Sequence, residues 1–200
     1  MPIEWGVASR ALPGQPESGD QQVVKPFPGG VLIAVLDGIG HGSEAATAAT
    51  IAKNLLEAHA ADPVMALVQR CHEALHASRG VALSIASFDA SQGLLTWLGV
   101  GNVVGVLLRR SATPVPVEKS LLLRAGVVGL QLPLSLDADS VRVSAGDTLI
   151  FATDGIQSDF ARGSAASQPP QKAAESILAH HCKSTDDALV LVVRFLSARP

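Results

Sequence analysis

The sequence has little of what several classes of protein need. Its 200 residues include no tyrosine and only two cysteines, Cys71 and Cys182. These two cysteines match no zinc-ligand spacing, and a fold built on disulfides needs a denser set in a smaller chain. The shortage of cysteine excludes a disulfide-rich scaffold and a Cys/His zinc site, and we expect the protein to work in a reducing cytoplasm.

Basic tracts and long apolar runs are also missing. Fifteen Lys and Arg against eighteen Asp and Glu give a formal net charge of -3, and no basic tract could neutralise a row of phosphates. The longest apolar runs, such as GGVLIAVL, fall well short of the roughly 20 residues that cross a bilayer. The N-terminus lacks the basic start and apolar stretch of a signal peptide. We expect a soluble protein with neither nucleic acid nor a membrane as its partner.

Apolar residues, by contrast, make up 48% of the chain. They are enough for one sizeable core, so we expect a single domain over residues 1–200. Residues 3–9 and 29–36 are predicted to be strands, and the second is apolar throughout, which is typical of a central strand covered on both faces. Residues 44–60 are rich in alanine and predict a helix. An apolar stripe at helical spacing over residues 63–75 predicts a second helix beside it.

The period of the pattern changes from residue 81 onward. Six short apolar runs between residues 81 and 154 are divided by Gly, Pro, Ser and Asp, and they predict a meander of antiparallel strands. A loop at 162–171, a helix at 172–182 and a strand at 187–195 are expected to follow. This order indicates an α+β layered domain, because a doubly wound sheet would alternate strand and helix.

Five acidic residues lie at the edges of predicted apolar strands: Asp20, Asp37, Asp154, Asp186 and Asp187. Asp37 and Asp154 each end an apolar run and precede a glycine, which lets the backbone come close to a ligand. If the strand ends gather in space, the carboxylates will repel one another and raise one another's pKa values. Divalent cations that prefer oxygen ligands, such as Mg²⁺ or Mn²⁺, would relieve this repulsion. A single Asp-Gly is more often a turn, but the whole set favours a metal site.

The glycine-rich turn after Asp37 holds two further candidates. His41 could be a general acid or a metal ligand, and it could equally be a surface residue. Ser43 lacks the base and the orienting acid that a serine nucleophile needs, and we expect it to cap the following helix. The glycines match neither a phosphate loop nor a dinucleotide motif, so a nucleotide-binding fold is discarded.

Six motifs occur in an order that resembles the PPM-type metal-dependent serine/threonine phosphatases, in their bacterial SpoIIE-like branch. They are SGDQ at 18–21, LDGIGHGSEAA at 36–46, GVGNV at 99–103, GVVGLQLP at 126–133, GDTLIFATDGI at 146–156 and DDALVLVV at 186–193. The resemblance implies an αββα four-layer sandwich, in which two antiparallel sheets are flanked by helices. It also implies a site for two Mn²⁺ or Mg²⁺ ions at one end of the sheets.

The same resemblance implies roles for individual residues. Asp37 would bridge the two cations and the Gly38 carbonyl would bind one of them. The site would be completed by Asp20, Asp154 and Asp186, with Asp187 as the second choice within its pair. The cations would lower the pKa of a water molecule that attacks phosphoserine or phosphothreonine, without a phosphoenzyme.

Two departures from the eukaryotic relatives concern the phosphate. Those relatives place a histidine directly after the Asp-Gly, where this chain has Ile39, so a role for His41 stays open. They also carry a phosphate-binding arginine shortly before the first acid, and Arg10 is the nearest candidate here. The SpoIIE-like branch shares both departures, so neither indicates an inactive enzyme.

The short length, and GVGN where many relatives have an AGH-type motif, make the chain most similar to the feedback phosphatases of stressosome signalling. The implied partners are phosphorylated stressosome scaffold proteins, STAS-domain anti-sigma antagonists or their switch kinase, and we expect a monomer. Two alternatives are left open. One is an inactive PPM-fold module that holds a phosphorylated partner, and the other is a hydrolase of small phosphoesters.

Overall fold

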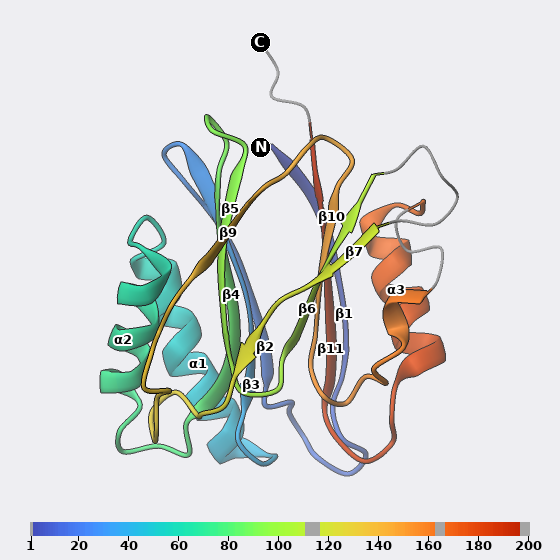
Figure 1. Ribbon diagram of the computed structural model, residues 1–200. Helices are drawn as coiled ribbons and strands as arrows, with labels where there is room; N and C mark the ends of the chain where they lie inside the picture. Colours follow the sequence, from blue (N-terminus) through green and yellow to red (C-terminus); the bar gives the residue numbers. More distant parts are fainter. Residues whose placement is uncertain (1, 111–116, 163–166, 197–200) are drawn as a thin grey trace.

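Two β-sheets face each other, and helices cover both outer surfaces (Figure 1). This computed structural model describes residues 2–110, 117–162 and 167–196. Helices α1 (Ser43–Ala58) and α2 (Val64–Ala74) cover one sheet, and α3 (Pro170–His181) covers the other. The layers follow the order α, β, β, α, which confirms the predicted α+β sandwich.

The sheet under α1 and α2, here called the first sheet, has the strand order β2-β3-β4-β5-β8, and β9 also pairs with β5. Its strands are β2 (Asp20–Phe27), β3 (Gly30–Gly38), β4 (Val81–Asp89), β5 (Leu94–Val100), β8 (Leu123–Arg124) and β9 (Asp139–Arg142). All pairs are antiparallel except the short β5/β8 pair, which is parallel. The apolar strand β3 therefore lies inside its sheet, as predicted.

The second sheet lies under α3 and has the order β1-β11-β10-β6-β7, with every pair antiparallel. Its strands are β1 (Ile3–Arg10), β11 (Ala188–Phe195), β10 (Thr148–Ala152), β6 (Val104–Arg109) and β7 (Val117–Ser120). A 3-10 helix, η1 (Phe160–Arg162), precedes α3. The first and last strands of the chain are thus neighbours in one sheet.

The core has three layers, and β3 shows why its sequence is apolar without a break. Successive side chains of a strand point to opposite faces. Val35 lies between the two sheets, in one cluster with Phe151, whereas its neighbour Leu36 packs on the helix side, in one cluster with Leu56. A third cluster joins the second sheet to α3. Because both faces of β3 are buried, every position of its interior has to be apolar.

The strand predictions missed β2, which forms from the polar stretch DQQVVKPF. This strand is at the edge of its sheet and pairs only with β3. An edge strand has one free side, so it tolerates Lys25 and also Pro26, which cannot donate a backbone hydrogen bond. The apolar pattern that marks a buried strand is therefore absent from β2.

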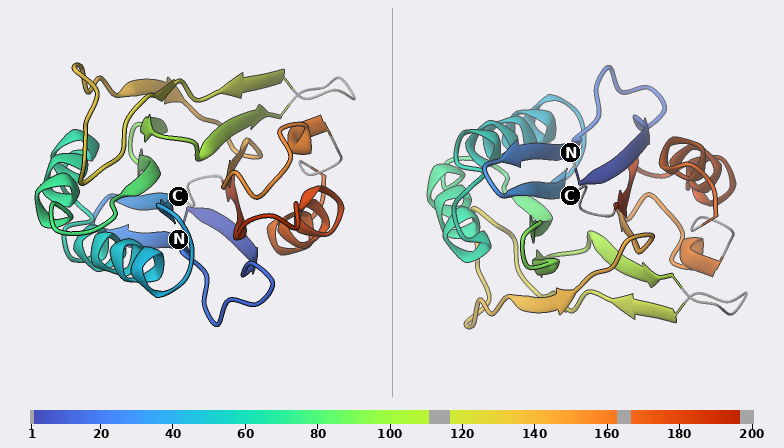
Figure 2. Two further views of the ribbon diagram at one scale, coloured as in Figure 1. Left: turned by 90° about the horizontal axis from the view of Figure 1, so that it is seen from below. Right: turned by 90° about the horizontal axis from the view of Figure 1, so that it is seen from above.

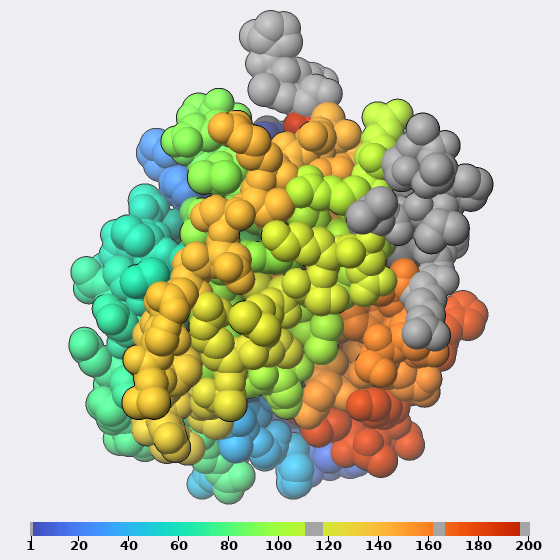
Figure 3. All heavy atoms as spheres, viewed as in Figure 1, coloured from blue at the N-terminus to red at the C-terminus, as the bar shows by residue number. Residues whose placement is uncertain are grey.

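The predicted meander was wrong as a description of the path between β4 and β10. The chain leaves the first sheet after β5, forms β6 and β7 in the second, returns for β8 and β9, and crosses again to β10. Residues 121–138 run over the outside during the return, as the yellow-green to yellow atoms of Figure 3 show. Alternation between apolar and polar residues reads alike in either sheet, so the pattern could not assign strands to sheets.

Two predicted segments fall partly outside the described residues. Residues 111–116 overlap the start of an expected strand, and 163–166 lie in the expected loop before α3. The helix α3 begins at Pro170, two residues earlier than predicted. Proline suits the first turn of a helix, because the backbone N–H that it lacks would have no partner there.

Candidate metal centre

The two sheets end together at the lower edge of Figure 1, and Figure 2 (left) looks onto this end. Asp20 opens β2 and Asp37 stands near the end of β3, directly across from it in the strand register. Asp154 follows β10, and the pair Asp186 and Asp187 immediately precedes β11. Because neighbouring strands are antiparallel, the end of one strand lies beside the start of the next in each sheet. The five acids therefore lie at the same end of the sandwich.

Burial and mutual repulsion change the acidity of two of these groups. Burial, followed by the charge of Asp37, raises the pKa of Asp20 to about 8. Burial, followed by the charges of Asp154 and Asp186, raises the pKa of Asp37 to about 7. Both carboxyl groups therefore hold protons more strongly than ordinary aspartates, and a nearby cation would favour their charged forms.

The two members of the Asp186–Asp187 pair have different surroundings. The carboxylate of Asp187 is buried and accepts backbone N–H hydrogen bonds from Leu12 at 2.6 Å and Gly19 at 2.7 Å. The carboxylate of Asp186 accepts a bond from the N–H of Asp187 at 2.9 Å. Burial, followed by the charges of Asp154 and Asp187, raises the pKa of Asp186. The geometry favours Asp186 as the ligand and gives Asp187 the task of holding the loop before β2.

Gly38 lies where no side chain would fit. A β-carbon there would collide with the backbone carbonyl of Ala45, and the N–H of Gly38 donates to the Gly19 oxygen at 3.1 Å. A β-carbon built on Gly19 would lie 3.4 Å from both the Gly38 carbonyl oxygen and Asp187 Oδ2. The Gly38 carbonyl is therefore part of the same oxygen-rich end as the acids.

Sequence reasoning missed three residues that hold the acids in place. Thr153 Oγ1 donates to Asp20 Oδ2 at 2.8 Å and accepts the Leu189 N–H at 2.9 Å. Asn102 Nδ2 donates to Asp154 Oδ2 at 2.7 Å, and its hydrogen bonding also opposes the rise in the pKa of Asp37. The third is Lys183. Asn102 stands within GVGNV and Thr153 within ATDG, so their positions inside the quoted motifs were the available signal.

Lys183 also contacts Arg10, the candidate phosphate-binding residue. Lys183 Nζ donates to the backbone oxygen of Asp154 at 2.6 Å, and Arg10 Nη2 donates to the backbone oxygen of Lys183 at 2.6 Å. Arg10 is exposed at the end of β1, so in this structure it approaches the acids through Lys183. The structure places it as a support of the segment before β11.

His41 is exposed in the turn between β3 and α1. Its connection to the acids is electrostatic, since its charge lowers the pKa of Asp186. The predicted cap by Ser43 is wrong: Gly42, at φ 77°, is the N-cap of α1, and no side chain bonds to the helix start. The turn needs a positive φ at both Gly40 and Gly42, which favours glycine at the boundary. Ser43 is therefore the first residue of the helix.

The donor atoms at this end of the sheets match the needs of a hard divalent cation. They are carboxylate oxygens and one backbone carbonyl, which suit Mg²⁺ or Mn²⁺ and do not suit zinc. Within the described ranges, no three Asp, Glu, His or Cys side chains lie close enough together to hold a metal ion. The acids influence one another through their charges. The residues therefore fit such a cation by the chemistry of their donor atoms alone.

Comparison with known proteins agrees with this architecture. Residues 28–196 match the model of the family described as stage II sporulation protein E (SpoIIE). The phosphoserine phosphatase RsbX of Bacillus subtilis (strain 168) is 28% identical over 146 residues, which are 72% of this chain and 69% of that protein. The layered fold, with acids at one end of its sheets, agrees with that of a PPM Ser/Thr phosphatase of Mycobacterium smegmatis, which has a TM-score of 0.72 at 18% identity. The chain belongs to the SpoIIE family.

Solved structures are similar over almost the whole chain. One, from a study of the bacterial stressosome as a modular system adapted to control secondary messenger signaling, has a TM-score of 0.86 at 29% identity and covers 96% of this chain and 99% of its own. RsbX in complex with magnesium has a TM-score of 0.83 at 25% identity, over 96% and 95% of the two chains. No helix among residues 2–110, 117–162 and 167–196 has the length and apolar content to span a bilayer.

Proposed function

We propose that the protein is a metal-dependent phosphatase that hydrolyses phosphoserine or phosphothreonine in other proteins. The observation that carries the proposal is the complete set of five acids at one end of the two sheets, with the pKa of Asp20 at about 8 and that of Asp37 at about 7. The similarity to RsbX, a phosphoserine phosphatase, supports the substrate class. An inactive binding module is not favoured, because it would have no need of the complete acid set.

The residues of the site divide into two groups. Two Mn²⁺ or Mg²⁺ ions would be held by Asp37, the Gly38 carbonyl, Asp20, Asp154 and Asp186. When bound, the cations would lower the pKa of the attacking water and hold the phosphoryl oxygens.

The second group positions the first. Thr153 fixes Asp20 through its hydroxyl, and Asn102 fixes Asp154 through its amide. Lys183 holds the backbone of Asp154 and places a positive charge beside the acids. His41 is the imidazole within electrostatic reach of Asp186, and it would be the candidate to give a proton to the departing serine oxygen.

The substrates that we propose are phosphorylated stressosome scaffold proteins or STAS-domain anti-sigma antagonists, so that the enzyme resets a stress-signalling pathway. The support is the structural similarity to a chain from a stressosome study and to RsbX. Partners of this kind would place the enzyme in the cytoplasm.

The test is the Asp37→Asn variant. We expect the wild type to release phosphate from a serine-phosphorylated STAS-domain protein only with Mn²⁺ or Mg²⁺, as read by the mass of the substrate. The variant should lose more than about a hundredfold in rate, because several kcal/mol of stabilisation by the cations would be lost, and its circular dichroism should stay unchanged. Full activity in the variant, or in EDTA-treated wild type, would sink the assignment.

A further inference from the structure

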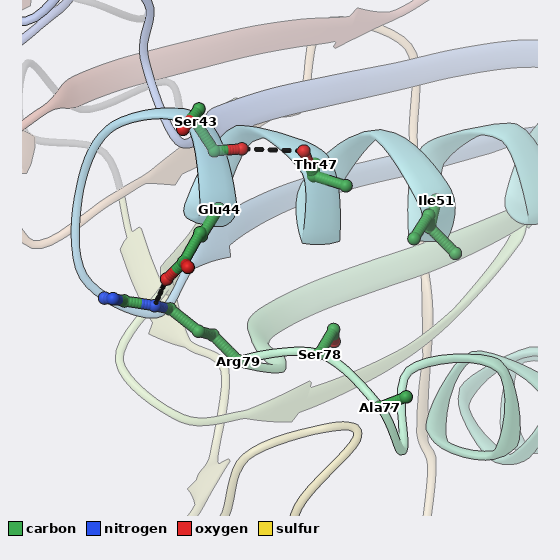
Figure 4. Close-up of a pocket in the computed structure, with 7 residues that line it drawn as sticks. All are labelled: Ser43, Glu44, Thr47, Ile51, Ala77, Ser78 and Arg79. Carbon is green, nitrogen blue, oxygen red and sulfur yellow. Dashed lines mark hydrogen bonds and ion pairs between the residues drawn. The ribbon is translucent and has the colours of Figure 1, made fainter.

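A groove opens beside the candidate metal centre, between the start of α1 and the segment that leads into β4 (Figure 4). Its volume is about 360 Å³, and its lining includes Ile51 from α1 and Ala77 from the facing segment. The Ile39 N–H donates to the Gly80 oxygen at 3.1 Å. This bond ties the turn that follows Asp37 to the residue next to Arg79, which lines the groove.

Arg79 stands at the mouth of the groove. Figure 4 shows its side chain extending toward the turn before α1, with its Nε bonded to Glu44. The guanidinium lies against Gly40, since a β-carbon there would be 2.7 Å from Arg79 Nη1. Within the described part of the chain, the hydrogen bond of Arg79 goes to Glu44 through Nε alone. The Nη1 and Nη2 groups keep their donors for a further acceptor.

The ion pair between Arg79 and Glu44 adds little to the stability of the fold. The side chains of Arg79 and Glu44 are 51% and 68% exposed, and exposed pairs contribute about 0 to 1 kcal/mol. The pair does hold the guanidinium in one orientation beside the turn. A guanidinium with two free amino groups is suited to binding a carboxylate or a phosphate through two parallel bonds.

The distance to the site defines what Arg79 can reach. Gly40 is three residues beyond Asp37, so it lies within about 11 Å of it along the chain, at about 3.8 Å per residue. An extended substrate chain advances about 3.3 to 3.6 Å per residue. A side chain that meets Arg79 would therefore come from a residue about two to four positions from the phosphorylated serine.

We propose that this groove binds the substrate chain beside the phosphorylated residue, and that Arg79 binds the carboxylate of an acidic residue there. The inference rests on the proposed phosphatase function and adds a preference for the sequence around the phosphoserine. The exposed Ile51, at 38%, offers the same chain an apolar contact further along the groove. Glu44 holds Arg79 in position.

The experiment uses two pairs of phosphoserine peptides. In the first pair, the residue three positions before the phosphoserine is Asp in one peptide and Asn in the other. In the second pair, the same difference lies three positions after the phosphoserine. With Mn²⁺, the wild type should show about a two- to fivefold higher kcat/KM for the Asp peptide of one pair, the difference expected of one exposed ion pair. Arg79→Gln should abolish that preference, mainly through KM, and should hydrolyse p-nitrophenyl phosphate within about twofold of the wild-type rate.

The matched control is Arg70→Gln. Arg70 is also an exposed arginine in a surface ion pair, with Asp62 at 3.3 Å and a 52% exposed side chain, but it does not line the groove. This variant should keep the wild-type preference. An additional peptide carries Lys in place of the Asp. The Arg79→Glu variant should hydrolyse this Lys peptide with a higher kcat/KM than the Asp peptide.

Three outcomes would overturn the inference. An Arg79→Gln variant that keeps the preference would remove the groove from the substrate path. An equal loss on the peptides and on p-nitrophenyl phosphate would mean that Arg79 binds the phosphoryl group itself. A wild type that hydrolyses all substrates without preference would overturn the inference and leave the proposed function intact, whereas a wild type that hydrolyses none of them would overturn both.

Discussion

The strand β3 passes within nine residues from the most buried part of the protein to its most acidic part. Its six residues from Val31 to Leu36 are 0% exposed and pack on both faces. Asp37 follows at once, with a pKa raised to about 7 by burial and neighbouring charges. Burial of the strand's interior raises the free energy of unfolding. Charge repulsion and desolvation at its acidic end lower the free energy of unfolding.

The same contrast occurs across the sandwich, where β10 and β11 bring Asp154 and Asp186 to the same end. The packed core keeps the acids close together in spite of their repulsion, because the strands that carry them are fixed by packing and cannot move apart. The core and the acidic end should therefore respond differently to substitution.

The sharpest way to separate the two regions is the Asp186–Asp187 pair. Asp186→Asn should lower Mn²⁺-dependent activity by at least about a hundredfold, because a proposed ligand of the cation is lost, and leave the free energy of unfolding unchanged or raised. Asp187→Asn should lower the free energy of unfolding by about 2 to 4 kcal/mol, because two backbone N–H groups lose their charged acceptor. Urea unfolding and phosphate release measure the two effects. The reverse pattern would exchange the roles that we assign to the pair.

A smaller effect is expected at Asn102, which links the two sheets through Asp154. Asn102→Ala should weaken Mn²⁺ affinity or activity by about ten- to a hundredfold, as is usual when a partner of a metal ligand is removed. Its stability should change little, since Asn102 is exposed. Titration of activity against Mn²⁺ measures this, and Asn54→Ala, in the exposed surface of α1, is the control. An unchanged Mn²⁺ requirement would remove Asn102 from the site.

A further effect concerns pH. Folding raises the pKa of Asp20 to about 8 and that of Asp37 to about 7, from 3.8. Between about pH 4 and pH 8 the folded protein then holds more protons on these groups than the unfolded chain. Their contribution makes the metal-free protein less stable as the pH rises through this window. Tm in EDTA should fall from pH 5 to pH 8, and less steeply in Asp37→Asn. An equal slope in the variant would contradict the raised pKa of Asp37.

Much of this arrangement could be predicted from the sequence. The unbroken apolar run of β3 predicted a central strand. Helix propensity located the first helix, apolar spacing the second and the preceding loop the third, each within a few positions. The five acids were identified because each stands at the edge of an apolar run. These are local patterns, and a local pattern can be read from consecutive residues.

The rest depends on contacts between distant parts of the chain. The bonds from Thr153 to Asp20 and from Asn102 to Asp154 span 133 and 52 residues, and no consecutive pattern encodes them. The choice within the Asp186–Asp187 pair depends on the backbone of Leu12 and Gly19. Arg79 was also missed, because its importance comes from a turn 39 positions earlier that folds against it.

The position of β11 has a consequence for how the protein is made. This last strand lies between β1 and β10, so the first strand to leave the ribosome has no partner until the last one follows. Contacts of such long range are slow to form. Asp186, two residues before the last strand, joins the other acids at the same late step. A nascent chain would therefore have no phosphatase activity until synthesis has passed β11, and a pulse of freshly made protein would gain activity with a lag.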